Sequence, residues 1–188
     1  EKDPSKLDAD LQGMYSGLTS VWNTFGRDAN RHYDFSYPAI VLMLENSGAD
    51  MVSKVTGYNW FSDDVQYTNR VYTSDQTVMI WKRYYQVIMA ANAVITSVDP
   101  ETEDESSLFY LGQAKAMRAF CYFQLAQTFQ FTYADNKEKP CVPIITETSE
   151  GNNHPRQTVE KVYGQIMDDL NDAVTMLENA KKADIKRV

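Results

Sequence analysis

The stretch YLGQAKAMRAFCYFQLAQTF, residues 110–129, decides the fold of this 188-residue chain. Apolar side chains fall on most faces of the helix that it predicts, which covers roughly residues 105–131. These side chains are Leu108, Leu111, Ala114, Met117, Phe120, Cys121, Leu125 and Phe129. Since a helix that is apolar nearly all round must be covered by other elements, we expect residues 105–131 at the centre of a helical bundle.

Two further helices flank the central one in sequence. Ser74 or Asp75 can cap the preceding helix, whose apolar side chains recur at three- and four-residue spacing until Pro100 ends it. The following helix begins near Thr158 and carries its apolar residues on one face. Between them, residues 132–157 contain three prolines and are predicted to be an irregular strap.

The amino-terminal part predicts two helices and a long loop. Pro4 opens the first helix, and Gly26 is predicted to end it. Pro38 opens a second one over residues 39–44, which we expect to be short and well buried. Residues 51–74 show no sustained helical period, so they are predicted to form a long structured loop. Long loops within compact domains are often functional, which makes this segment the first place to look for ligand contacts.

The fold class expected from these patterns is all-α. A cluster of acidic residues at 99–105 is interpreted as a solvated turn that joins two antiparallel helices. Such a helical hairpin is the unit from which helical solenoids are stacked. We therefore predict a tetratricopeptide-like array of antiparallel helices with long irregular insertions, forming a single domain over residues 1–188.

Composition excludes several classes of function. The formal net charge is −8, which disfavours binding to nucleic acid. No apolar run approaches the length of a membrane-spanning helix, and no leader sequence is evident. Cys121 and Cys141 are too few for a disulfide scaffold, and we expect buried free thiols.

Three segments together resemble the SusD/RagB family. They are WKRYYQVIMAANAVI from Trp81, YLGQAKAMRAFCYFQLAQTF from Tyr110 and RQTVEKVYGQIMDDLNDAVTML from Arg156. Their order and spacing are similar to those of the family, as are the opening DPSKLDADLQGMYSGL and the strap segment KPCVPIITE. The signature positions matched include Trp81, Tyr85, Asn92, Gly112, Arg118 and Tyr122.

The resemblance implies a setting that the residues alone do not indicate. It implies a surface-exposed lipoprotein of the outer membrane of a Bacteroidetes-type bacterium, anchored through an amino-terminal lipidated cysteine that is absent from this chain. The implied partner is a SusC-like TonB-dependent transporter, and the implied cargo is an oligosaccharide or polysaccharide, although some relatives handle peptides. Family members are much longer, so the chain is expected to be the amino-terminal helical portion of such a protein.

The sequence contains none of the familiar motifs for metal-dependent hydrolysis or nucleotide binding. The two histidines, His32 and His154, do not pair at helical spacing, and there is no Cys-x2-Cys motif or glycine-rich phosphate loop. We therefore expect no enzyme activity, no metal and no cofactor. The adjacent acids Asp63/Asp64 and Asp168/Asp169 are interpreted as solvated surface, since neighbours on a helix point to different faces.

Several polar residues inside apolar helices are assigned structural roles. Arg118 interrupts an apolar run, and an unpaired buried charge is very costly, so an ion pair is expected, with Asp169 as one candidate partner. Asn92 is interpreted as a buried hydrogen-bonding group. Trp81 and Tyr85 are expected in the core because helical spacing alone explains them.

The candidate glycan-binding residues lie in the long loop, with Trp60 at their centre. Aromatic faces stack on the apolar faces of pyranose rings, while amide and guanidinium groups bind the hydroxyls. The alternative is that this loop packs against a carboxy-terminal part of the fold, in which case the protein could be a protein–protein interaction scaffold without a sugar site. The full candidate set is Tyr58, Asn59, Trp60, Tyr67, Asn69, Arg70 and Tyr72.

Overall fold

The computed structural model describes residues 4–29, 31–49, 51, 58–148 and 153–180. Its helices are α1 (Pro4–Ser16), α2 (Tyr37–Asn46), α3 (Ser62–Gln66), α4 (Asp75–Ile95), α5 (Glu105–Phe129), α6 (Tyr133–Asn136) and α7 (Val159–Ala180), with a 3-10 turn at Arg27–Ala29. Within these described ranges the only β-type pairing is an isolated bridge between Pro140 and Thr158. The all-α class predicted from the sequence is confirmed.

The chain divides into two compact units, which we describe separately. The first comprises residues 1–14 and 84–188, and the second comprises residues 15–83. The expectation of a single domain over the whole chain stays a prediction.

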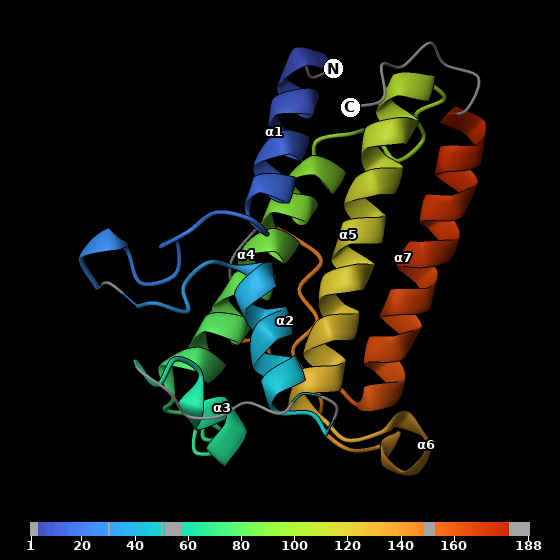
Figure 1. The fold of residues 1–188 in the computed structure, drawn as a ribbon. Helices are drawn as coiled ribbons and strands as arrows, with labels where there is room; N and C mark the ends of the chain where they lie inside the picture. Colours follow the sequence, from blue (N-terminus) through green and yellow to red (C-terminus); the bar gives the residue numbers. More distant parts are fainter. Residues whose placement is uncertain (1–3, 30, 50, 52–57, 149–152, 181–188) are drawn as a thin grey trace. The chain divides into compact units, whose positions relative to one another are not determined.

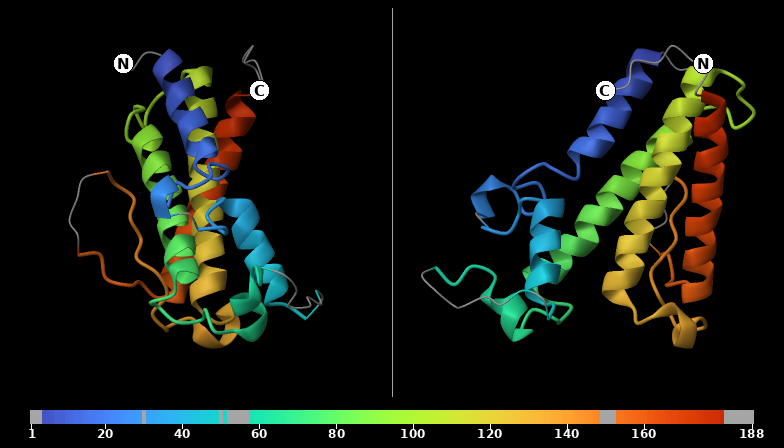
Figure 2. Two further views of the ribbon diagram at one scale, coloured as in Figure 1. Left: turned by 60° about the vertical axis from the view of Figure 1, so that its left-hand side comes forward. Right: turned by 45° about the vertical axis from the view of Figure 1, so that its right-hand side comes forward.

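In the first unit, α5 and α7 lie side by side and antiparallel (Figures 1 and 2). Asp104 begins α5, because its carboxylate accepts a hydrogen bond of 2.8 Å from the backbone N–H of Ser107. The buried face of α7 is formed mainly by small and branched apolar side chains. Leu170 and Val174, which were predicted with the other apolar residues of this helix to lie on its buried face, are exposed. The acidic turn between α4 and α5 is largely exposed, as predicted.

The strap predicted to be irregular over residues 132–157 contains the short helix α6, and its residues 137–148 are tied to α4 and α5 by tyrosine hydroxyl groups. The Tyr85 hydroxyl donates to the carbonyl of Pro143 at 2.7 Å, and the Tyr122 hydroxyl lies 2.9 Å from the carbonyl of Ile145. The backbone N–H of Ile145 also donates to the Tyr122 hydroxyl at 2.7 Å. Because Cys141 is fully buried as well, the strap belongs to the core of this unit.

The first helix is shorter than predicted, since α1 ends at Ser16 and not at Gly26. Residues 18–20 still form turn-type bonds to Tyr15 and Ser16, but backbone groups of this segment also bond to residues far along the chain. The N–H of Trp22 donates to the carbonyl of Asp34 at 2.6 Å, and the N–H of Tyr37 donates to the carbonyl of Leu18 at 3.0 Å. These long-range bonds override the apolar spacing that predicted a longer helix.

A buried ion pair holds this segment in the second unit. Arg83 and Asp34 have fully buried side chains, with 3.4 Å between Nη2 and Oδ1. Arg83 also donates to Thr24 Oγ1 at 2.7 Å, and the Asp34 carboxylate accepts the backbone N–H groups of Thr24 and Phe25. Because a buried charge without partners is very costly, this network fixes residues 17–29 and 31–36 against the first half of α4.

Helices α2 and α3 pack against each other in the second unit (Figure 1). Helix α2 lies where Pro38 predicted it, but Val41 and Leu44 are exposed, so it is less buried than expected. Helix α3 lies inside the segment predicted to be irregular throughout. It has only five residues, which is too short to produce a helical period in the sequence.

Candidate functional site

The candidate loop has an unusual backbone on both sides of Trp60. Asn59, Phe61 and Tyr67 adopt left-handed conformations with φ of 55°, 58° and 59°. Asparagine tolerates this region, whereas bulky aromatic residues rarely adopt it. Left-handed residues begin and end α3, because Phe61 is its N-cap and Tyr67 its C-cap. Such strain persists only where surrounding contacts enforce it, and it is often found at binding sites.

Trp60 stacks on a residue that the sequence did not single out. Its ring centroid lies 5.2 Å from that of His32, and the two ring planes differ by only 19°. Phe61 meets the same imidazole edge-on at 5.6 Å. Trp60 nevertheless keeps 60% of its surface exposed, and Tyr58, 91% exposed, lies 6.5 Å away at a tilt of 44°. The structure thus brings Tyr58, Trp60 and His32 together as one exposed aromatic group.

A second pair comes from the end of α3. The guanidinium carbon of Arg70 lies 4.1 Å from the ring centroid of Tyr67, which is the geometry of a cation–π contact. Both side chains are exposed, and so is Tyr72, at 87% of its surface. These groups combine exposed aromatic faces with hydrogen-bond donors, and their role in sugar binding stays a prediction.

Asn69 is occupied by internal contacts. Its amide nitrogen donates to Asp64 Oδ1 at 2.6 Å and to Gln76 Oε1 at 2.7 Å, and Gln76 Nε2 donates to Asp64 Oδ2 at 2.9 Å. Burial raises the pKa of the Asp64 carboxyl, and these amide hydrogen bonds partly oppose that rise. The interpretation of Asp64 as solvated surface was wrong, because its carboxyl is buried and bonded by the side-chain amides of Asn69 and Gln76. The amide nitrogen of Asn69 therefore stabilises the loop, and it is not available to donate to a ligand while these bonds persist.

His32 was missed because sequence spacing contains no signal for it. It lies 28 positions before Trp60, outside any helix, and only the folded backbone brings the two rings together. Its neighbours are held by Asp75, since Arg31 Nη2 lies 2.7 Å and the Tyr33 hydroxyl 3.3 Å from Asp75 Oδ2. Burial lowers the pKa of the His32 imidazole, and the carboxylate of Asp63 opposes this shift.

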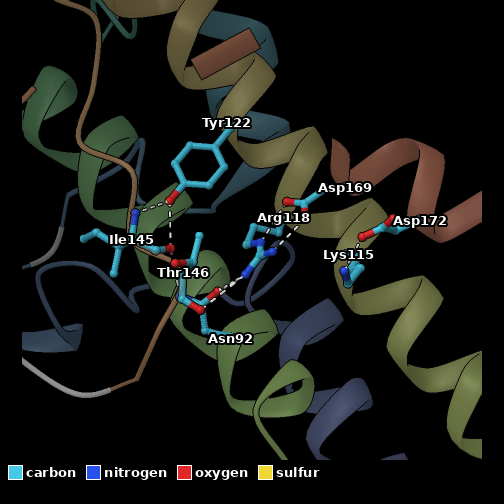
Figure 3. A network of polar contacts seen from close by, with 8 residues as sticks. All are labelled: Asn92, Lys115, Arg118, Tyr122, Ile145, Thr146, Asp169 and Asp172. Atoms are coloured by element: carbon cyan, nitrogen blue, oxygen red, sulfur yellow. Dashed lines mark hydrogen bonds and ion pairs between the residues drawn. The ribbon is translucent and has the colours of Figure 1, made fainter. Parts of the chain in front are cut away.

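The structural residues predicted in the first unit form one polar network (Figure 3). Arg118 pairs with Asp169, and its Nη1 donates to Asn92 Oδ1 at 2.8 Å. The amide nitrogen of Asn92 donates in turn to the carbonyl of Ile145 at 2.9 Å. The predicted pair with Asp169 and the structural role of Asn92 are confirmed, whereas the assignment of Asp169 to solvated surface was wrong. Trp81 and Tyr85 are half-buried, so they are less enclosed than expected.

Within the described residues, no group of three or more His, Cys, Asp or Glu side chains could hold a metal ion. In the same part of the chain, none of the helices combines the length and apolar character that crossing a membrane requires.

The fold is that of an all-helical, tetratricopeptide-like protein of the SusD type. The chain belongs to the SusD-like family described as starch-binding and associating with the outer membrane, whose model matches residues 29–187. This assignment agrees with the resemblance carried by the helices of the first unit.

Solved structures with the same fold come from Bacteroides species. A SusD-like carbohydrate binding protein from Bacteroides vulgatus matches with a TM-score of 0.79 and 23% identity, over 94% of this chain and 36% of that one. A SusD superfamily protein from Bacteroides fragilis matches with a TM-score of 0.70 and 22% identity, over 90% and 38% of the two chains. One from Bacteroides thetaiotaomicron has a TM-score of 0.68 and 20% identity, over 93% and 37%.

The chain therefore spans little more than a third of the length of these structures. At this level of identity they show the fold alone. Among curated proteins, no relative matches the chain.

Proposed function

We propose that this chain is part of the glycan-binding component of a SusC/SusD-type uptake system. In this role it captures an oligosaccharide through the loop around Trp60 and passes it to a TonB-dependent transporter. The observation that carries the proposal is the exposed Trp60 ring, held parallel to His32 with Tyr58 beside it. Membership of a family described as starch-binding agrees with it.

Aromatic rings of this kind suit sugars for a physical reason. A pyranose presents C–H groups on its faces and hydroxyls around its edge, so a flat, exposed ring covers the apolar part. Arg70, which stacks on Tyr67, offers guanidinium donors close to the same loop. The net charge of −8 disfavours polyanionic ligands, which favours a neutral glycan over nucleic acid.

Binding without chemical turnover is part of the proposal. The loop offers aromatic stacking and hydrogen bonds, and its buried carboxyl, Asp64, is already engaged by two amides. A glycosidase would need a pair of carboxyl groups flanking the bond that it cleaves. We therefore expect oligosaccharides to be bound and released unchanged.

A glycan array followed by calorimetric titration tests the proposal. With the complete polypeptide as the cell makes it, we expect saturable binding to at least one neutral oligosaccharide. Trp60→Ala should weaken that binding about 5- to 150-fold, if a pyranose gains as much from the ring as a stacked nucleic-acid base does, about 1–3 kcal/mol. Melting temperature should change little, because most of the Trp60 side chain is exposed.

Trp22→Ala is the matched control. Trp22 is another exposed tryptophan of the second unit, and its ring lies against the guanidinium of Arg27 at 5.3 Å. Affinity in this variant should equal that of the wild type. Equal affinity in the Trp60 variant would exclude the proposed site, and the absence of any sugar ligand would favour a protein-interaction scaffold.

The cellular setting is the second part of the proposal: a lipid-anchored protein on the outer membrane, facing outward, bound to a SusC-like transporter. Proteinase treatment of intact cells should remove the protein, and gentle solubilisation should release it together with a TonB-dependent transporter. Protection from the proteinase in intact cells, or isolation without any transporter, would count against this location and partner respectively.

A further inference from the structure

Stacking leaves the two faces of the Trp60 ring in different surroundings. The His32 imidazole covers one face at a centroid distance of 5.2 Å and an angle of 19°. Trp60 keeps 60% of its surface exposed, with Tyr58 tilted by 44° at a centroid distance of 6.5 Å, and much of the ring outside the stack therefore remains accessible. A parallel ring on one side restricts rotation of the indole and leaves a single face for a sugar.

His32 can act as a fixed support because its own segment is anchored. Arg31 on one side and Tyr33 on the other both bind the carboxylate of Asp75, at 2.7 and 3.3 Å. The next residue, Asp34, is fully buried and paired with Arg83. Contacts on both flanks therefore hold the backbone that presents the imidazole.

The loop that carries Trp60 is anchored to α4 at Gln76, the residue that follows Asp75. Gln76, which follows Asp75 in the first turn of α4, donates to the buried carboxyl of Asp64 and accepts from Asn69. Asp75 thus holds the segment with His32, and Gln76 holds the loop with Trp60. The first turn of α4 sets the position of the two stacked rings relative to each other.

We infer that His32 is a positioning residue for glycan binding, which fixes the Trp60 ring so that one defined face receives a pyranose. This inference rests on the proposed function. A ring that is already immobilised loses less side-chain entropy when a ligand binds, and this saving corresponds to about a two- to tenfold gain in affinity. His32 contributes it without touching the sugar.

The stack itself can be tested without a ligand. In NMR spectra of the imidazole carbons and protons, the His32 signals are identified by their loss in His32→Phe, and the signals of the exposed His154 serve as reference. Ring-current shielding by Trp60 should move the His32 signals upfield, and Trp60→Ala should abolish that shift while the His154 signals stay in place. Unchanged His32 signals in this variant would overturn the inference.

The effect on binding is measured by titrating maltoheptaose, with cellohexaose for comparison, into the complete polypeptide. His32→Ala should weaken binding of the preferred sugar about two- to tenfold. His32→Phe should restore affinity, because a phenyl ring can still stack on the indole. In the Trp60→Ala background, His32→Ala should have no further effect, which a general loss of structure would not reproduce.

The possible outcomes separate the two proposals. Loss of binding in Trp60→Ala with wild-type affinity in His32→Ala would overturn the role of His32 and leave the sugar site standing. A His32→Phe variant as weak as His32→Ala would also overturn the role of His32. Wild-type affinity in both alanine variants, or no binding of either sugar by the wild type, would overturn the positioning role together with the site on which it rests.

Discussion

Arg118 and Asp169 form a buried, two-pronged ion pair that joins α5 to α7, with 2.8 Å from Nε to Oδ2 and 2.6 Å from Nη2 to Oδ1 (Figure 3). The third guanidinium nitrogen of Arg118, Nη1, donates to Asn92 Oδ1 at 2.8 Å. Because each charge is enclosed, each depends on the other, and removal of one leaves an uncompensated charge in the core.

Arg118→Ala and Asp169→Ala are therefore each expected to lower the free energy of unfolding by about 3–5 kcal/mol. The double variant should lose less than the sum of the two, since the second substitution removes a charge that the first has already left unpaired. Urea unfolding of the four proteins measures the coupling. Strictly additive losses would mean that the two groups do not interact.

Lys115 and Asp172 provide a control on the same two helices. Their ion pair has a similar distance of 2.5 Å, but 51% of the Asp172 side chain is exposed. Solvent-exposed pairs contribute about 0–1 kcal/mol, so Lys115→Ala should have a small effect. A loss as large as that of Arg118→Ala would show that burial is not what makes the Arg118 pair important.

The helices of the first unit could be predicted because the information for them is local. Periodic apolar residues indicated α4, α5 and α7, and a single arginine in an apolar helix required an acid on another helix. Asp169 was named as one candidate for that acid, although the pair Asp168/Asp169 was also assigned to solvated surface, which holds for Asp168 alone. The strap was foreseen from its prolines, but the tyrosine hydroxyls that bind it have no signature in sequence spacing.

The second unit was predicted less well, because long-range contacts determine its backbone. Residues 17–25 have helical spacing, yet bonds to Asp34 and Arg83 hold them in another conformation. Asp64 was assigned to the surface because its partners, Asn69 and Gln76, lie on either side of a bend that spacing does not indicate. The aromatic residues of the candidate loop were identified by composition, whereas their arrangement around His32 was not.

The pH dependence of stability provides a test of the environment of His32. Burial holds the pKa of its imidazole below the ordinary value of 6.5. Between that lowered pKa and about 6.5 the unfolded chain binds more protons than the folded chain, so protonation favours unfolding and stability falls as the pH falls through this range. His32→Phe removes the titrating group, so its free energy of unfolding should decline less than that of the wild type from neutral pH to about pH 5.

An NMR titration checks the same point directly. The pKa of His32 should lie below 6.5 and should rise towards it in Trp60→Ala, where one of the rings that cover the imidazole is removed. Asp63 acts in the opposite direction, so Asp63→Asn should lower the pKa of His32 further. A pKa of His32 above 6.5 in the wild type would contradict a partial burial of the imidazole against Trp60 and Phe61.

The two cysteines should be inert in the folded protein. Cys121 and Cys141 are fully buried free thiols, and burial raises the pKa of both, so little reactive thiolate is present near neutral pH. With Ellman's reagent we expect slow reaction in buffer and rapid release of two equivalents in denaturant. Rapid native-state reaction of either thiol would show that the strap or α5 opens readily.

The close contact between α5 and α7 depends on Gly112. A Cβ atom at this position would lie 2.8 Å from Leu177 Cγ and 3.3 Å from the backbone oxygen of Ala173. The leucine side chain can shift, but the helix backbone cannot do so without separating the two helices. We therefore expect Gly112→Ala to destabilise the protein by about 1–3 kcal/mol, despite the higher helix propensity of alanine.

Gly164→Ala in α7 is the matched control for Gly112→Ala. It places the same methyl group in a helix where no heavy atom of the surroundings lies within 4 Å. Only the higher helix propensity of alanine should then affect stability, so the variant should be more stable than the wild type by about 0.5–1 kcal/mol. Opposite signs for the two variants in urea unfolding would demonstrate the steric contact, whereas a gain in both would mean that α5 and α7 tolerate a wider separation at Gly112.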